Sequence, residues 1–161
     1  MPGRRTAAAA AAVALAAAVL LAGCTPDAKE NAADTPHEAR DALVKTIHDT
    51  AARLAVAGWN EDSAPDVARC DAAEPSVAYG YGYGAPSGTE HLADAEKVAA
   101  YWKTLGMTVR VVTEPDPVVF GTGGPVKALS FSTAPGDYYI DGTSLCVLGD
   151  VGTLTDEQVV G

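Results

Sequence analysis

Closely spaced turn residues in the last third of the 161-residue chain restrict its fold more than any other feature. Residues 115–117 read Pro-Asp-Pro, residues 121–125 Gly-Thr-Gly-Gly-Pro and residues 134–136 Ala-Pro-Gly. Parallel strands need crossover connections of a dozen or more residues, so turns this close together predict an antiparallel meander. The expected strands cover residues 107–113, 118–120, 126–133, 137–141 and 144–148.

Two upstream segments have the periodicity of amphipathic helices. The first begins with Thr35, Pro36 and Glu38, a capping box with proline at the first helical position, and runs to about Ala57, before Gly58. The second runs from residue 89 or 90 to Leu105 and is followed by Gly106. Both segments repeat apolar residues at spacings of three and four, which predicts one buried face on each helix.

Residues 76–84 alternate with a period of two, which predicts a strand between these helices. A shorter strand is expected at residues 67–71. Helix, short strands, helix and meander together predict an α+β fold with two helices on one face of an antiparallel sheet. Residues 151–161 are mostly polar, and we expect no stable element in this C-terminal tail.

The N-terminus has a different composition from the rest of the chain. Arg4 and Arg5 precede an uncharged, Ala-rich run over residues 7–22. This order is typical of a secretory signal peptide, and the run is short for a membrane span of about 20 residues. We therefore expect the segment to be removed rather than kept as a transmembrane anchor.

Leu21, Ala22, Gly23 and Cys24 resemble the lipobox of bacterial lipoproteins. The resemblance implies a cut before Cys24 and attachment of diacylglycerol to its thiol, so residues 1–23 would be the signal peptide. It also implies a lipid-anchored protein on the extracytoplasmic face of the cell membrane, with membrane lipid as its partner through acylated Cys24. Two acyl chains hold a protein stably on a membrane where one does not.

Residues 101–109 and 141–146 resemble small exported lipoproteins of actinobacteria. The first reads Tyr-Trp-Lys-Thr-Leu-Gly-Met-Thr-Val and the second Asp-Gly-Thr-Ser-Leu-Cys. The resemblance spans about residues 35–150 and implies an architecture and an exported location, but no reaction. We expect a flexible tether at residues 24–34 and a single domain at residues 35–150.

Cys70 and Cys146 are the two thiols that remain once Cys24 carries lipid. An exported location favours a disulfide between them. The chain-entropy model gives about 4.5 kcal/mol for closing a loop of this length. Two buried thiols or a redox pair are the alternatives, and the absence of a C-x-x-C motif argues against the redox pair.

Tyr79, Tyr81 and Tyr83 share one face of the predicted strand, opposite Gly80, Gly82 and Gly84. If the tyrosines face inward, they are core residues with hydroxyls at its edge, and this is the favoured arrangement. If they face outward, they form an exposed strip that can stack a sugar or a peptide, and the glycines leave room for a helix to approach the sheet. Trp59 and Trp102 are expected in the core.

Charge and residue content argue against several classes of site. The net charge of -10 is opposite to the basic surface of a nucleic-acid-binding protein. His37 and His48 lie three helical turns apart, about 16 Å, which is too far to share a metal ion. His91 has no partner at helical spacing, and all three histidines are expected at the surface. The carboxylates fit no calcium loop, and no complete dinucleotide or serine-hydrolase motif is present. We therefore predict no metal and no cofactor.

These observations predict a membrane-anchored envelope lipoprotein that binds an envelope protein or a cell-wall component without catalysing a reaction. One alternative is binding of a small ligand or glycan at Tyr79, Tyr81 and Tyr83. A second is a hydrolase whose carboxylates the sequence does not single out.

Overall fold

The computed structural model describes residues 33–61, 64–86, 88–134 and 138–160. The predicted signal peptide, Cys24 and most of the predicted tether lie outside these residues. Cleavage and lipidation at Cys24 therefore stay predictions. Within the described ranges, no helix is both long enough and apolar enough to cross a membrane.

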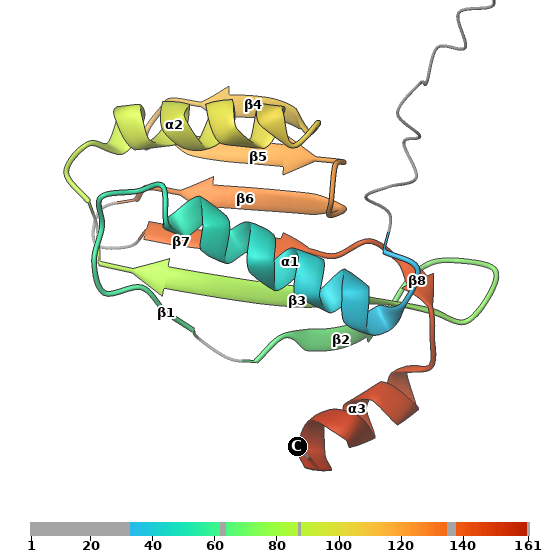
Figure 1. The fold of residues 1–161 in the computed structure, drawn as a ribbon. Helices are drawn as coiled ribbons and strands as arrows, with labels where there is room; N and C mark the ends of the chain where they lie inside the picture. The colour runs from blue at the N-terminus through green and yellow to red at the C-terminus, as the bar shows by residue number, and fades with distance from the viewer. Residues whose placement is uncertain (1–32, 62–63, 87, 135–137, 161) are drawn as a thin grey trace, which may run out of the picture.

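One antiparallel sheet carries two helices on one of its faces, as predicted (Figure 1). The helices are α1 (Pro36–Ala51), α2 (His91–Thr104) and α3 (Val151–Val160). The strands are β1 (Asn60–Glu61), β2 (Asp66–Arg69), β3 (Ser76–Ala85), β4 (Thr108–Val112), β5 (Val118–Thr122), β6 (Ala128–Ser132), β7 (Tyr138–Thr143) and β8 (Val147–Leu148). The strand β1 had not been expected, and the segment predicted over residues 144–148 is a strand only in β8.

The strand order is β1-β3-β7-β6-β5-β4, and β2 and β8 also pair with β3. Strands β4 to β7 are consecutive antiparallel neighbours, which confirms the meander. The connection through α2 carries the chain from β3 to the far edge of the sheet, where β4 begins. The meander then returns until β7 pairs with β3.

Helix α1 begins at the predicted capping box. Glu38 donates its backbone N–H to the Thr35 hydroxyl (3.3 Å) and accepts from the Thr35 backbone N–H (3.1 Å). Hydrogen bonds from the Thr35 side chain and from backbone N–H groups lower the pKa of Glu38. The helix ends at Ala51 rather than near Ala57. Backbone bonds from Arg53 and Leu54 to carbonyls three residues earlier tighten the chain there, and Leu54 turns into the core.

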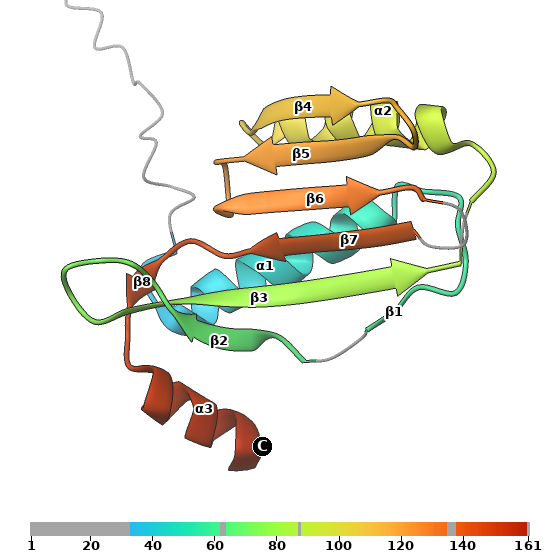
Figure 2. The ribbon, with the colours of Figure 1, turned by 180° about the vertical axis from the view of Figure 1, so that it is seen from behind.

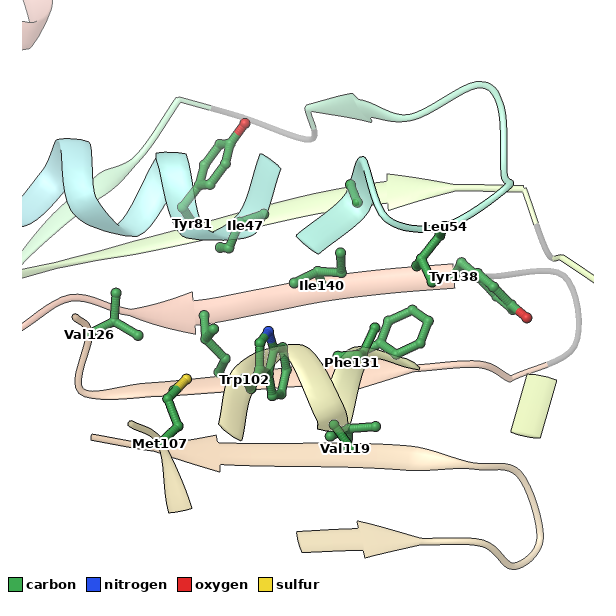
Figure 3. Packing of buried hydrophobic residues seen from close by; sticks show 14 of the residues in the cluster. Ile47, Leu54, Tyr81, Trp102, Met107, Val119, Val126, Phe131, Tyr138 and Ile140 are labelled. Atoms are coloured by element: carbon green, nitrogen blue, oxygen red, sulfur yellow. The ribbon is translucent and has the colours of Figure 1, made fainter. Parts of the chain in front are cut away.

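The core fills the space between these helices and the sheet (Figure 3). Trp102 of α2 is fully buried, as predicted, and its indole N–H donates to the Thr50 hydroxyl of α1 at 3.0 Å. Phe131 and Ile140 come from neighbouring strands and are also fully buried. Both helices are thereby joined to each other and to the meander. Trp59, in contrast, is only half-buried.

The C-terminal tail forms a helix, which corrects the expectation that no stable element follows Gly149. Asp150 caps α3, because its carboxylate accepts from the backbone N–H (2.9 Å) and the hydroxyl (3.2 Å) of Thr153. The backbone bond is the main reason that the pKa of Asp150 is lowered. Leu154 is buried in a small second cluster with Val77 and Val147. The domain therefore extends past residue 150.

Cys70 and Cys146 form the predicted disulfide, with their Cα atoms 6.2 Å apart. The bond joins the end of β2 to the segment that leads into β8. It therefore links two chain segments that both pair with the N-terminal half of β3.

Candidate functional site

The three tyrosines of β3 do not form an exposed strip. Tyr79 is 2% exposed and Tyr81 is 5% exposed, because α1 packs on their face of the strand. The favoured core arrangement is confirmed for both residues, and their burial leaves little of either ring accessible to a ligand. Burial raises the pKa of Tyr79. The Tyr81 hydroxyl lies 2.9 Å from Nε2 of His48, so it meets a polar partner at the edge of the core.

Tyr83 belongs instead to an aromatic cluster at one edge of the sheet. Its ring centroid lies 4.5 Å from that of His48 and 5.4 Å from that of Trp59, and the Trp59 ring is nearly parallel to it. All three side chains are half-buried. The indole N–H of Trp59 is enclosed and has no hydrogen-bond partner among the described residues. Of the three predicted ligand-binding tyrosines, Tyr83 is the one that keeps substantial exposure.

The histidines differ from the expectation that all three lie at the surface. His37 is exposed and pairs with Glu157 at 3.5 Å. His48 is half-buried in the aromatic cluster. His91 is half-buried too, with Nε2 3.0 Å from the Gly88 carbonyl oxygen. Helix packing over the sheet covers the last two, which periodicity alone did not indicate.

The glycine face of β3 is occupied by a side chain rather than by a helix. A Cβ atom on Gly82 would lie 2.7 Å from Cζ of Tyr139, and one on Gly84 would lie 3.3 Å from Cδ2 of the same ring. Tyr139 comes from the neighbouring strand β7. The alternative arrangement, in which a helix approaches the sheet over these glycines, is therefore not the one observed, and the missing side chains of Gly82 and Gly84 accommodate Tyr139.

The sheet face that carries these glycines has no helix on it in the described part of the chain (Figure 2). We call it the open face. Its central row runs across five strands through Arg110, Phe120, Ser130, Asp141 and Gly82, which are register partners. The Arg110 guanidinium lies over the Phe120 ring at 4.4 Å, and the Ser130 hydroxyl donates to the Asp141 carboxylate.

Two further rows of the open face flank the central one. They consist of Val112, Val118, Ser132, Tyr139 and Gly84 on one side, and of Thr108, Thr122, Ala128, Thr143 and Gly80 on the other. Within these three rows only Arg110 and Asp141 carry a charge. From β3 to β4 the open face is therefore nearly neutral on a chain whose net charge is -10, whereas Asp66 of β2, the register partner of Gly80, adds a negative charge beyond β3. Phe120, at 37% exposure, is the most exposed large apolar side chain of these three rows.

A groove of about 580 Å³ lies on the other side of the molecule, between the end of α1 and α2. Its lining consists of Ala52, Arg53, Lys97, Ala100, Tyr101 and Thr104. The Arg53 guanidinium carbon lies 3.6 Å from the centre of the Tyr101 ring. The groove thus combines two cationic side chains with one aromatic ring.

Asp94 is a buried carboxylate at the start of α2. It accepts from Nζ of Lys97 at 3.0 Å and from the Tyr138 hydroxyl at 3.2 Å. Burial, with the nearby Asp94 carboxylate as the second cause, raises the pKa of Tyr138 to about 12. These bonds join α2 to β7. The described residues contain no group of three or more His, Cys, Asp or Glu side chains able to hold a metal ion.

No family model matches this chain, and no curated protein matches it. One solved structure, a crystal structure of a DUF4853 family protein from Actinomyces odontolyticus, is similar with a TM-score of 0.46 and 17% sequence identity. The match covers 70% of this chain and 63% of that chain. The chain thus spans less than two thirds of the protein that it resembles.

Proposed function

We propose that this protein is a lipid-anchored module of the bacterial cell envelope that binds a protein partner through the open face, without catalysing a reaction. The observation that carries the proposal is the asymmetry of the sheet. One face is covered by two helices, whereas the other presents Phe120 and Arg110 among mostly small residues, with Asp141 as the one carboxylate of the three rows. Interface cores are likewise poor in charge and rich in aromatic residues and arginine.

The size of the open face sets the expected strength of the contact. Five strands about 4.8 Å apart and three rows about 7 Å apart cover roughly 19 by 14 Å. This area is well below the ~800 Å² per partner of a standard stable interface. We therefore expect weak, reversible binding, which covalent capture detects better than a pull-down does. Anchoring both partners at one membrane would raise their effective concentration.

The lipid anchor is tested by changing Cys24. In Cys24→Ala, we expect neither incorporation of a clickable fatty acid nor cleavage at Gly23-Cys24, because the proposed acylated thiol is missing. Labelling on a gel beside membrane fractionation measures both. If Cys24→Ala still incorporates the lipid, or the wild type incorporates none, the lipoprotein assignment fails.

The open face is tested by photo-crosslinking in intact cells. A photoreactive residue in place of Thr122, which is exposed on this face, is expected to yield one defined protein adduct. The same residue in place of Thr155, an exposed threonine of α3, serves as the matched control and should not yield that adduct. Equal yields from both positions would contradict binding through the open face.

A second candidate function is binding of a small ligand or glycan at the aromatic cluster of His48, Trp59 and Tyr83. The enclosed indole N–H of Trp59 favours it, because an unpaired buried donor is costly and a ligand acceptor would satisfy it. Titration with soluble glycans, followed by tryptophan fluorescence in the wild type and in Trp59→Phe, tests this candidate. Saturable quenching that disappears in Trp59→Phe supports it, and no change in fluorescence counts against it.

A further inference from the structure

We propose that the groove between α1 and α2 binds the phosphate group of a soluble organic phosphate ester. The inference concerns a different surface from the open face and does not depend on it. Arg53 and Lys97 are the charged residues of the lining, and both are cationic. The sign of this local charge is opposite to the net charge of -10 of the chain.

Arg53 has the geometry of an anion-binding residue. Its guanidinium lies 3.6 Å from the centre of the Tyr101 ring, so the ring limits the orientations of the charged group. No carboxylate of the described residues lies within ion-pair distance of Arg53. A guanidinium that rests on an aromatic ring keeps the N–H donors at its edge available for a bidentate contact with phosphate.

Lys97 supplies the second positive charge. Its ammonium donates one hydrogen bond to Asp94, which is buried below it, and an ammonium has three donors. This bond holds Nζ near the wall of the groove, while the Lys97 side chain remains 48% exposed. Asp94 itself does not line the groove. Arg53 follows the carbonyl end of α1 and offsets part of the partial negative charge there, so the anion requires both cations.

The rest of the groove fits an organic group. Its volume of about 580 Å³ lies within the range of small-molecule sites and is far larger than one phosphate. Ala52 and Ala100 have short side chains, and the Tyr101 ring offers apolar surface beside the cations. An ester that carries a small polar or apolar group therefore fits better than inorganic phosphate.

The position of the groove favours a soluble ligand over a lipid headgroup. The chain enters α1 at Pro36, whereas Arg53 follows the other end of this helix. With a rise of 1.5 Å per residue, the two ends of α1 lie about 24 Å apart. A tether that leads from Pro36 to a membrane therefore joins the domain at the end of α1 remote from the groove.

Calorimetry and phosphorus NMR on the full protein, purified from membranes in detergent, test the assignment. The probes are glycerol 3-phosphate, its uncharged counterpart glycerol, inorganic phosphate, and detergent micelles that contain phosphatidylglycerol. We expect saturable binding of glycerol 3-phosphate, weaker binding of inorganic phosphate and no binding of glycerol. Arg53→Gln should weaken binding of glycerol 3-phosphate at least about tenfold, because a hydrogen bond to a charged group is lost.

Two further variants separate site binding from a general charge effect. Arg53→Lys, which keeps the charge but not the planar fork, should lose affinity by a smaller factor than Arg53→Gln. Lys103→Gln removes an exposed lysine of α2 outside the groove and should bind as the wild type does. Equal binding by Arg53→Gln and the wild type, or equal losses in Arg53→Gln and Lys103→Gln, would overturn the proposal. A response restricted to the phosphatidylglycerol micelles would overturn the soluble ester as the ligand.

Discussion

The two faces of the sheet are built from alternate residues of the same strands, yet they differ in helix cover, in burial and, on β3, in side-chain size. On β3, Tyr79 and Tyr81 lie under α1 within the core, while Gly80 and Gly82 lie on the open face. The residues that look most like a ligand platform in the sequence are therefore structural. The face with the smallest side chains is the accessible one, and its prominent groups, Phe120 and Arg110, come from two strands of the meander.

The comparison shows why aromatic content alone does not locate a binding surface. In a strand where tyrosine alternates with glycine, the pattern fits either burial of the tyrosine face or its exposure. Packing of α1 decides between them, because a helix covers a face that offers large apolar area and excludes water from it.

The largest expected effect comes from truncating matched aromatic residues on the two faces. Tyr81→Ala should lower the free energy of unfolding by about 3 kcal/mol or more, because it leaves a cavity and removes the hydroxyl partner of His48. Phe120→Ala on the open face should cost less than about 1 kcal/mol, since the ring is already partly in water. Denaturant unfolding measures both variants. Similar losses for the two would remove the distinction between the faces.

Smaller changes in stability are expected when two glycines on the open face of β3 are replaced by alanine. Gly82→Ala should destabilise the domain by about 1–3 kcal/mol, because its Cβ would collide with the Tyr139 ring. Gly80 has no atom within 4 Å of an added Cβ, so Gly80→Ala should change stability by no more than about 0.5 kcal/mol. The difference in thermal stability between Gly82→Ala and Gly80→Ala measures the contribution of the contact with Tyr139. A neutral Gly82→Ala would show that this ring moves aside freely.

The smallest effect concerns pH and the Asp94–Tyr138 contact on the covered face. The pKa of Tyr138 is raised to about 12 in the folded protein from an ordinary value of 10.0. The unfolded state therefore loses this proton first. The stabilisation is fully present below about pH 10 and is lost as the pH rises from about 10 toward about 12. Unfolding at several pH values in this window should show a weaker decline in Tyr138→Phe than in the wild type. Identical slopes would mean that Tyr138 ionises normally.

Local signals predicted much of the fold. The capping box at Thr35 and Glu38 specified where α1 begins, and dense turns specified the meander from β4 to β7. The period-two pattern of residue types in β3 predicted a strand, and the two cysteines other than Cys24 predicted the disulfide. Each of these features depends on neighbouring residues or on residue counts.

The features that were missed depend on contacts between distant segments. Helix α3 has apolar residues at only a few positions, and its stability depends on contacts of Leu154 with Val77 and Val147. The one local feature that could have predicted this helix is the Asp150 cap. Pairing of β3 with β7 places Tyr139 over Gly82, which no pattern within either strand reveals. The groove likewise needs Arg53, which follows the end of α1, and Tyr101 of α2, so composition alone did not indicate it.

The most direct test of the open face as the binding surface measures the photo-crosslinking yield and the free energy of unfolding of a single variant. Asp141→Lys reverses the only negative charge in the three rows of the face, and Asp141 is exposed. With the photoreactive residue at position 122, this variant should lose most of the protein adduct and keep its free energy of unfolding within about 1 kcal/mol of the wild type. An undiminished adduct in a stably folded Asp141→Lys protein would contradict binding through the open face.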